Sequence, residues 1–185
     1  MFIDSIIIGI VGSLLLGGSF KGFVNIKLKH PWLITVSFLI QFGSIYFFKD
    51  HLLAAVILSN IGLLLFCLVN YKNSGFTYMV IGIVLNLIVM LANRGRMPVD
   101  AEAAKILSPE DFPALLAGEY GKHIAISDHS HLNILGDIIF LQSPYPRPII
   151  ISIGDILLSI GVILFMYKVM VKNKKKSEEV AVNGA

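Results

Sequence analysis

The chain has 185 residues, of which 56% are hydrophobic and only 15% are charged. Soluble domains carry about 25% charged residues, so this composition excludes an ordinary soluble domain. The one cysteine, Cys67, excludes a disulfide framework and a thiolate metal cluster. Phosphate-loop, dinucleotide-binding and HExxH zinc-protease motifs are missing, and nothing indicates nucleic-acid binding or a cofactor.

The apolar residues fall in blocks near the length of about 20 residues that crosses a bilayer. We therefore predict an all-α polytopic transmembrane helix bundle of about five spans, forming a single domain over residues 1–171. The first block lacks the basic start of a signal peptide, because its first charge is Asp4, so we expect it to be retained. The predicted spans are residues 2–18, 31–48, 52–70, 76–92 and 148–171.

The distribution of lysine and arginine predicts the orientation, because short cytoplasmic loops are enriched in both. We expect the N-terminus outside and the C-terminus inside a bacterial cytoplasmic membrane, with residues 172–185 as a disordered basic tail that can lie against anionic lipid. The cytoplasmic segments then contain Lys21, Lys27, Lys29, Lys72, Lys168, Lys172, Lys174, Lys175 and Lys176. The outer segments contain Lys49, Arg94, Arg96, Lys105, Lys122 and Arg147, spread over a longer stretch.

Residues 93–147 form one long polar loop, which we place outside the cytoplasm. Within it, SPEDFPALLAGEY predicts a short helix capped by Ser108, with Asp111 three residues later. The apolar run HLNILGDIIFL is too short to span a membrane and favours an interfacial or re-entrant segment. QSPYPRP then breaks regular structure.

Polar residues inside the predicted spans are of two kinds. Serine and glycine at helical spacing indicate helix packing, whereas Gln41 and Asn86 are expected to face a partner inside the bundle. Asp155 lies seven residues into the last predicted span, about 10 Å deep at 1.5 Å per residue. A carboxylate there costs several kcal/mol unless it is paired, hydrated or protonated. It is either a hydrogen-bonded structural residue or a functional one.

A second aspartate makes the functional alternative specific. Asp137 precedes Asp155 by 18 residues, and each stands between a glycine and an isoleucine. If both meet at the outer membrane surface, they could share one proton. One carboxylate would then activate water while its protonated partner polarises a scissile carbonyl. Burial would favour this shared-proton state.

The run SPYPRPIIISIGDILLSIGVILF resembles the final helix of lipoprotein signal peptidase, a bacterial membrane aspartyl peptidase. The resemblance implies Asp137 and Asp155 as the catalytic pair, with Asp155 followed by Ile156 or Leu158 and by Gly161. LNLIVMLANRGRMPVD resembles the end of that family's preceding helix, which implies substrate-binding roles for Asn86 or Asn93 and for Arg94 or Arg96. The chain departs from that family at Ser152, where the family has asparagine, in its five predicted spans where the family has four, and over residues 99–130.

The chain as a whole resembles an uncharacterised family of small bacterial membrane proteins, through the stretches NRGRMPV and SIGDILL. That likeness implies a location and no activity. Arg94 and Arg96 can either clamp a phosphate or carboxylate or anchor the chain at lipid headgroups. A metal site is a further alternative, because histidine and aspartate occur at short spacing in the loop at His123, Asp128, His129 and His131, with His51 on the same side.

Two functions therefore compete. The first is a binding or accessory protein at the outer face of the membrane, which contacts lipids and a membrane-anchored peptide or an anionic headgroup. The second is an intramembrane aspartyl hydrolase that uses Asp137 and Asp155. Transport is weaker, because the spans contain one central charge and no paired discontinuous helices.

Overall fold

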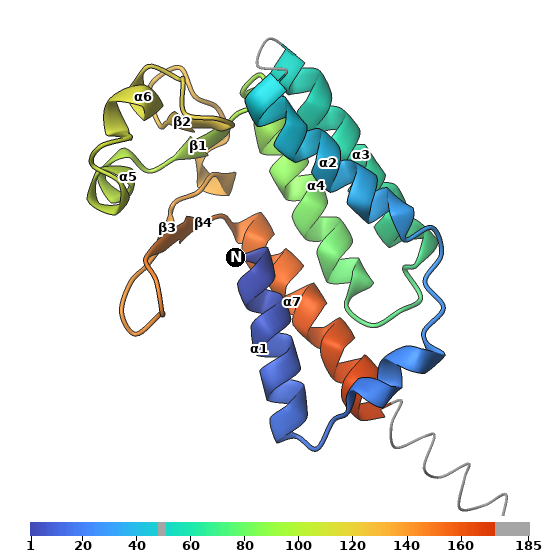
Figure 1. Cartoon of the computed structure of the whole chain (residues 1–185). Helices are drawn as coiled ribbons and strands as arrows, with labels where there is room; N and C mark the ends of the chain where they lie inside the picture. The colour runs from blue at the N-terminus through green and yellow to red at the C-terminus, as the bar shows by residue number, and fades with distance from the viewer. Residues whose placement is uncertain (48–50, 173–185) are drawn as a thin grey trace, which may run out of the picture.

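The computed structural model describes residues 1–47 and 51–172. Each of the five predicted apolar segments contains a helix (Figure 1). They are α1 (Phe2–Leu15), α2 (Trp32–Phe47), α3 (Leu52–Val69), α4 (Phe76–Ala92) and α7 (Ile153–Tyr167), the last continued by the π-helical turn η4 (Lys168–Lys172). The predicted end of the second span at Phe48 and the tail after Lys172 lie outside the described residues.

Two of these helical segments are long and apolar enough to cross a membrane, Leu52–Val69 and Ile153–Lys172. The other three long helices are apolar but shorter. A 3-10 helix, η1 (Phe20–Asn25), connects α1 to α2 and packs on η4 at the end of the bundle away from the polar loop (Figure 1).

The polar loop folds into a unit that we name the loop subdomain, residues 93–152. It contains strands, so the expected all-α class is wrong for this part of the chain. Its elements are β1 (Met97–Val99), α5 (Ala101–Leu107), α6 (Phe112–Leu116), β2 (His123–Ala125), the 3-10 turn η3 (Asn133–Leu135), β3 (Ile139–Leu141) and β4 (Ile149–Ile151). Strand β1 pairs in parallel with β2, and β3 pairs antiparallel with β4.

The segment around Asp137, predicted to be interfacial or re-entrant, has an extended backbone. Val99 and Asp137 form a parallel bridge, in which the Asp137 N–H donates to the Pro98 carbonyl at 2.8 Å. The Asp100 N–H in turn donates to the Asp137 carbonyl at 3.0 Å. The backbone of Asp137 is therefore held in place by its hydrogen bonds to Pro98 and Asp100, and only its side chain can change position.

The short helices of the subdomain differ in part from the prediction. Helix α6 is present, but Asp111 occupies its N-cap position, and the expected cap Ser108 donates from Oγ to Asp111 Oδ2 at 2.7 Å. Helix α5 was not predicted. Its N-cap is Asp100, whose carboxylate accepts the Ala103 N–H at 2.8 Å, so a local side-chain cap starts this short helix.

The last helix starts later than predicted. Residues 149–151 are three isoleucines, whose branched side chains favour strands, and they pair with β3 instead of opening the helix. Helix α7 begins at Ile153, after a capping box between Ser152 and Asp155. Asp155 is thus in the first helical turn, and the predicted depth of seven residues inside a span is wrong.

The bundle is built by direct contacts of α7 with α4 and α1, of α3 with α4, and of α2 with α3 (Figure 1). Helices α4 and α7 approach at glycines: a Cβ at Gly82 would lie 2.5 Å from the Gly154 carbonyl oxygen, and one at Gly161 would lie 2.6 Å from that of Gly75. On α1, small residues (Ser5, Gly9 and Ser13) are buried, while Ile3, Ile7 and Ile8 are exposed.

We predict that Gly161→Ala destabilises the protein and that Gly12→Ala does not. Alanine is favoured over glycine inside a helix by about 0.5–1 kcal/mol. At Gly161 the new methyl group would also lie 2.6 Å from Met79 Cγ and 2.9 Å from the Met79 nitrogen, so α4 and α7 must separate. At Gly12 it meets nothing within 4 Å. Thermal unfolding followed by circular dichroism checks this, and equal melting temperatures for the two variants would contradict it.

Candidate functional site

A cavity of about 550 Å³ lies between the helices and extends to the loop subdomain. All five long helices contribute to its wall, which is largely apolar. Polar side chains also line it: Gln41, Asn60, Asn86, Lys122, His123, Asp137 and Asp155. Known ligand pockets occupy roughly 300–1,000 Å³ and combine apolar walls with a few placed polar groups, so this cavity has the size and character of a binding site.

Asp155 is held by a closed set of hydrogen bonds between α4 and α7. The Asn86 Nδ2 group donates to Asp155 Oδ1 at 3.0 Å, and the Ser152 Oγ donates to Asn86 Oδ1 at 2.9 Å. The Asp155 N–H donates to Ser152 Oγ at 3.0 Å, and the Ser152 N–H donates to Asp155 Oδ2 at 3.2 Å. The positive end of the helix dipole also favours a carboxylate in the first turn. Both oxygens of Asp155 thus accept hydrogen bonds.

This arrangement requires Gly154. A Cβ at that position would lie 2.0 Å from Asn86 Oδ1 and 2.8 Å from the Gly82 carbonyl oxygen. A side chain there would therefore push Asn86 away from Asp155. The glycine before this aspartate is explained by the close approach of α4.

Asp137 is the second carboxylate in the cavity, and it is 7% exposed. Its Oδ2 lies 3.6 Å from His123 Nε2, while its buried Oδ1 has no hydrogen-bond partner among the described residues. Burial, and after it the charge of Asp155, raise the pKa of Asp137 to about 7, while Lys122 opposes the shift. At neutral pH Asp137 is therefore divided between its protonated and ionised forms.

His123 is neutral at the same pH. Burial lowers its pKa to about 4, and the charge of Lys122 acts in the same direction. Its side chain is 30% exposed and lines two cavities, so the exposed part faces confined space. Because the imidazole is uncharged, its contact with Asp137 is not an ion pair at pH 7. The pair can offer both hydrogen-bond donors and acceptors to a neutral polar group.

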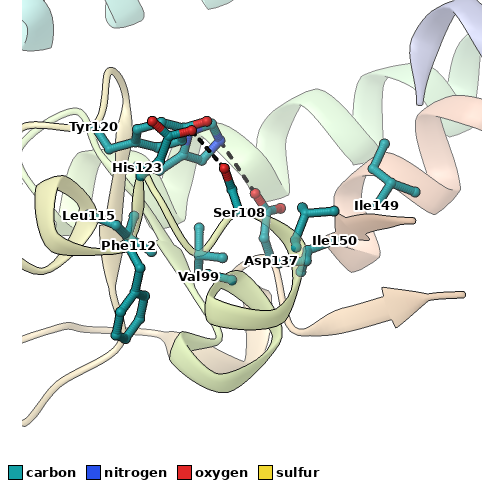
Figure 2. A pocket seen from close by; sticks show the side chains of 12 residues that line it. Val99, Ser108, Phe112, Leu115, Tyr120, His123, Asp137, Ile149 and Ile150 are labelled. Carbon is teal, nitrogen blue, oxygen red and sulfur yellow. Dashed lines mark hydrogen bonds and ion pairs between the residues drawn. The ribbon is translucent and has the colours of Figure 1, made fainter. Parts of the chain in front are cut away.

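A second, smaller cavity of about 130 Å³ lies inside the loop subdomain (Figure 2). Apolar side chains from β1, α5, α6 and β4 form most of its wall. Residues His123, Asp137, Ile149 and Ile150 line both this cavity and the larger one. The two cavities therefore adjoin at the carboxylate and the imidazole.

The structure gathers only part of the predicted site. Asn86, Asp137 and Asp155 line the larger cavity, whereas Asn93, Arg94 and Arg96 line neither cavity. Asn93 donates to the carbonyls of Val89 and His131 and accepts the His131 N–H, so its amide ties the loop to the end of α4. Arg96 donates to the Gly118 carbonyl, and Arg94 is exposed at a positive φ of 55°.

Sequence reasoning missed Lys122 and assigned His123 only to a metal site. Both reach the cavity because β2 pairs with β1, the strand that follows α4. In this pairing His123 lies opposite Met97, the first residue of β1. No local pattern signals this pairing. For the metal alternative, residues 1–47 and 51–172 bring together no group of three or more histidine, cysteine, aspartate or glutamate side chains that could hold an ion.

We predict that Asp137→Asn changes the pH dependence of stability. The folded protein keeps the Asp137 proton up to about pH 7, whereas an unfolded chain releases it near pH 3.8. The contribution of this group to the free energy of unfolding is fully present below about pH 4 and is lost as the pH rises to 7. At about 1.4 kcal/mol per pKa unit, the loss amounts to up to about 4 kcal/mol. Relative to wild type, the variant should therefore gain stability between pH 4 and pH 8.

Thermal melts of the two proteins across this range measure the effect. A buried asparagine can add an offset of about 1–3 kcal/mol, but this offset does not depend on pH. Asp128→Asn, in an exposed loop, is the control with the same change of side chain. A pH-independent difference between Asp137→Asn and wild type would contradict the assignment.

Comparison with known proteins places the chain in a family. A model described as "Family of unknown function (DUF5317)" matches residues 25–167. A Thermotoga maritima protein described as an uncharacterized protein is 35% identical over 166 residues, which cover 89% of each chain. No solved structure matches. The resemblance to an uncharacterised family is confirmed, and the chain belongs to the DUF5317 family of unknown function.

Proposed function

We propose that the protein is an integral membrane protein of five spans, and that it binds an amphiphilic molecule at the outer face of the bacterial cytoplasmic membrane. The apolar part of that molecule would occupy the cavity between the helices. Its polar part would lie against Asp137, Asp155, Asn86 and Lys122. The observation that carries the proposal is the cavity itself, because it joins a long apolar interior to a cluster of polar groups at one end.

The surface of the helices supports a membrane location. Large apolar side chains are exposed on each long helix, and on α1 the buried residues are small while Ile7 is 54% exposed. A soluble protein shows the opposite pattern, with apolar residues inside and polar ones outside. At 1.5 Å per residue, α3 is about 27 Å long, close to the bilayer core of about 30 Å. The shorter helices fit a locally thinner bilayer or apolar flanks.

The arrangement of the ends supports the predicted orientation. The N-terminus lies beside the loop subdomain, where Arg147 pairs with Asp4, and the start of α3 lies beside the end of α4, from which the subdomain continues (Figure 1). The connections at the other end contain Lys21, Lys27, Lys29 and Lys72, and η4 adds Lys168 and Lys172. Lysine enrichment on one side is typical of the cytoplasmic face, so the loop subdomain would be outside.

The orientation can be tested with two matched substitutions in a Cys67→Ala background. Ser127→Cys places a thiol in an exposed part of the loop subdomain, and Ser74→Cys places one in the turn between α3 and α4. We expect a membrane-impermeant maleimide to label Ser127→Cys in intact spheroplasts and Ser74→Cys only after permeabilisation. The reverse labelling pattern would overturn the orientation, and labelling of both in intact cells would overturn the spanning arrangement.

Binding in the interhelical cavity can be tested on one helix. Ile6 lines the cavity, and its neighbour Ile7 faces outward. Because tryptophan at position 6 would occupy the part of the cavity beside α1, we expect Ile6→Trp to retain less of any amphiphile that co-purifies with the wild type in mild detergent. Ile7→Trp should retain it. Native mass spectrometry measures the bound fraction, and equal retention by the two variants would contradict the proposal.

An aspartyl hydrolase is the second candidate, and one observation favours it. Asp137 and Asp155 line the same cavity, and the charge of Asp155 raises the pKa of Asp137. Under this hypothesis Asp155, whose two oxygens accept hydrogen bonds from Asn86 and Ser152, would be the base that activates water. Protonated Asp137 would then polarise a carbonyl oxygen. Under this hypothesis Asp137→Asn and Asp155→Asn each abolish turnover of the bound amphiphile, Asp128→Asn does not, and turnover retained by both would exclude the pair.

A further inference from the structure

The smaller cavity has a chemistry of its own. Apolar side chains form most of its wall, among them Val99, Ala104, Leu107, Phe112, Leu115 and Ile150 (Figure 2). Its volume is about 130 Å³, and an apolar protein cavity of about 150 Å³ is known to bind benzene. It can therefore accept an apolar group about the size of a benzene ring.

The polar groups near this cavity are not equally available to a ligand. Ser108 and Asp111 hydrogen-bond to each other at 2.7 Å, as the dashed line in Figure 2 shows. Asp137 Oδ1, by contrast, is buried and has no partner among the described residues. A buried oxygen without a hydrogen bond costs about 1–3 kcal/mol, so a ligand that supplies the missing partner at this point binds with that penalty removed.

The polar group that fits is neutral. Burial around Asp137 already disfavours charge there, so a second charge beside it would be costly to desolvate. An amide meets the requirement in both states of Asp137, because its N–H donates to the carboxylate and its carbonyl accepts from the protonated acid. Neutral His123, 3.6 Å away, adds no net charge.

We propose that the two cavities are halves of one site, and that its ligand has two apolar arms joined by a neutral amide at the carboxyl group of Asp137. The long arm lies between the helices, and the short arm, about the size of a benzene ring, lies inside the loop subdomain. This inference rests on the proposed binding function and specifies its ligand class. The proposed ligand differs from a single-chain fatty acid in having a neutral polar group, because the charged end of a fatty acid would lie beside the buried carboxylate.

Two defined probes test the proposal with the purified full-length protein. N-benzyl dodecanamide and N-methyl dodecanamide share the long arm and the amide and differ only in the short arm. Burying a group of phenylalanine size is worth about 1.5–3 kcal/mol, so we expect the benzyl compound to bind about 10- to 100-fold more tightly. Isothermal titration calorimetry in detergent measures both dissociation constants.

Variants locate the short arm. Ala104→Phe would fill the smaller cavity, and we expect it to weaken binding of the benzyl amide at least 10-fold and leave the methyl amide unchanged. Ala117→Phe, at an exposed position after α6, is the control. Leu107→Ala enlarges the same cavity from its partly exposed side and should favour N-(1-naphthylmethyl) dodecanamide over the benzyl amide. This second variant keeps the test valid if Ala104→Phe does not fold.

The outcomes separate the two proposals. If the benzyl and methyl amides bind equally, or if Ala104→Phe folds and affects both alike, the two-cavity site is wrong while the binding function stands. If neither amide binds the wild type, and nothing amphiphilic co-purifies with it, the binding function fails as well. Selective loss of the benzyl amide in Ala104→Phe, with a gain of the naphthyl compound in Leu107→Ala, supports the site.

Discussion

The close contact of α4 with α7 is the constraint on which the rest of the structure depends. It exists because glycines stand at the crossing, where the backbone of one helix lies in the space that a side chain would take on the other. In the membrane location proposed above, helices would gain little from hydrophobic burial against each other, so such close packing and the polar contacts that it permits would be the main sources of their association. Here the same approach brings Asn86 onto Asp155 and so fixes the first turn of α7.

The loop subdomain depends on this fixed point. Strand β4 leads directly into the capping box of α7, and its partner β3 follows Asp137 in the chain. Asp137 is in turn bridged to β1, which continues from the end of α4. The two carboxylates are thus attached to the two helices that pack most closely, and their separation is set by backbone pairing.

Asp137 and Asp155 line the same cavity but differ in their surroundings. Asp155 accepts hydrogen bonds from Asn86 and Ser152 at a helix N-terminus, whereas Asp137 is buried with one oxygen unpartnered. The second environment disfavours a charge. A site with two carboxyl groups in such different surroundings can bind a neutral polar group in several ways, and the same difference would serve acid–base chemistry. Binding and hydrolysis are therefore alternatives that one geometry supports.

The sequence by itself determined the five apolar helices, because long apolar runs and their breaks are local properties. It also selected Asn86, Asp137 and Asp155, since polar residues in or next to apolar runs are conspicuous. Only the tertiary structure decided that residues 149–151 form a strand, that Asp155 caps a helix, and that Lys122 and His123 reach the cavity. Asn93 and Arg96 bind loop carbonyls instead. Apart from the capping box of Ser152 and Asp155, which is local, those outcomes depend on pairing between segments distant in the chain, which no local pattern of residues specifies.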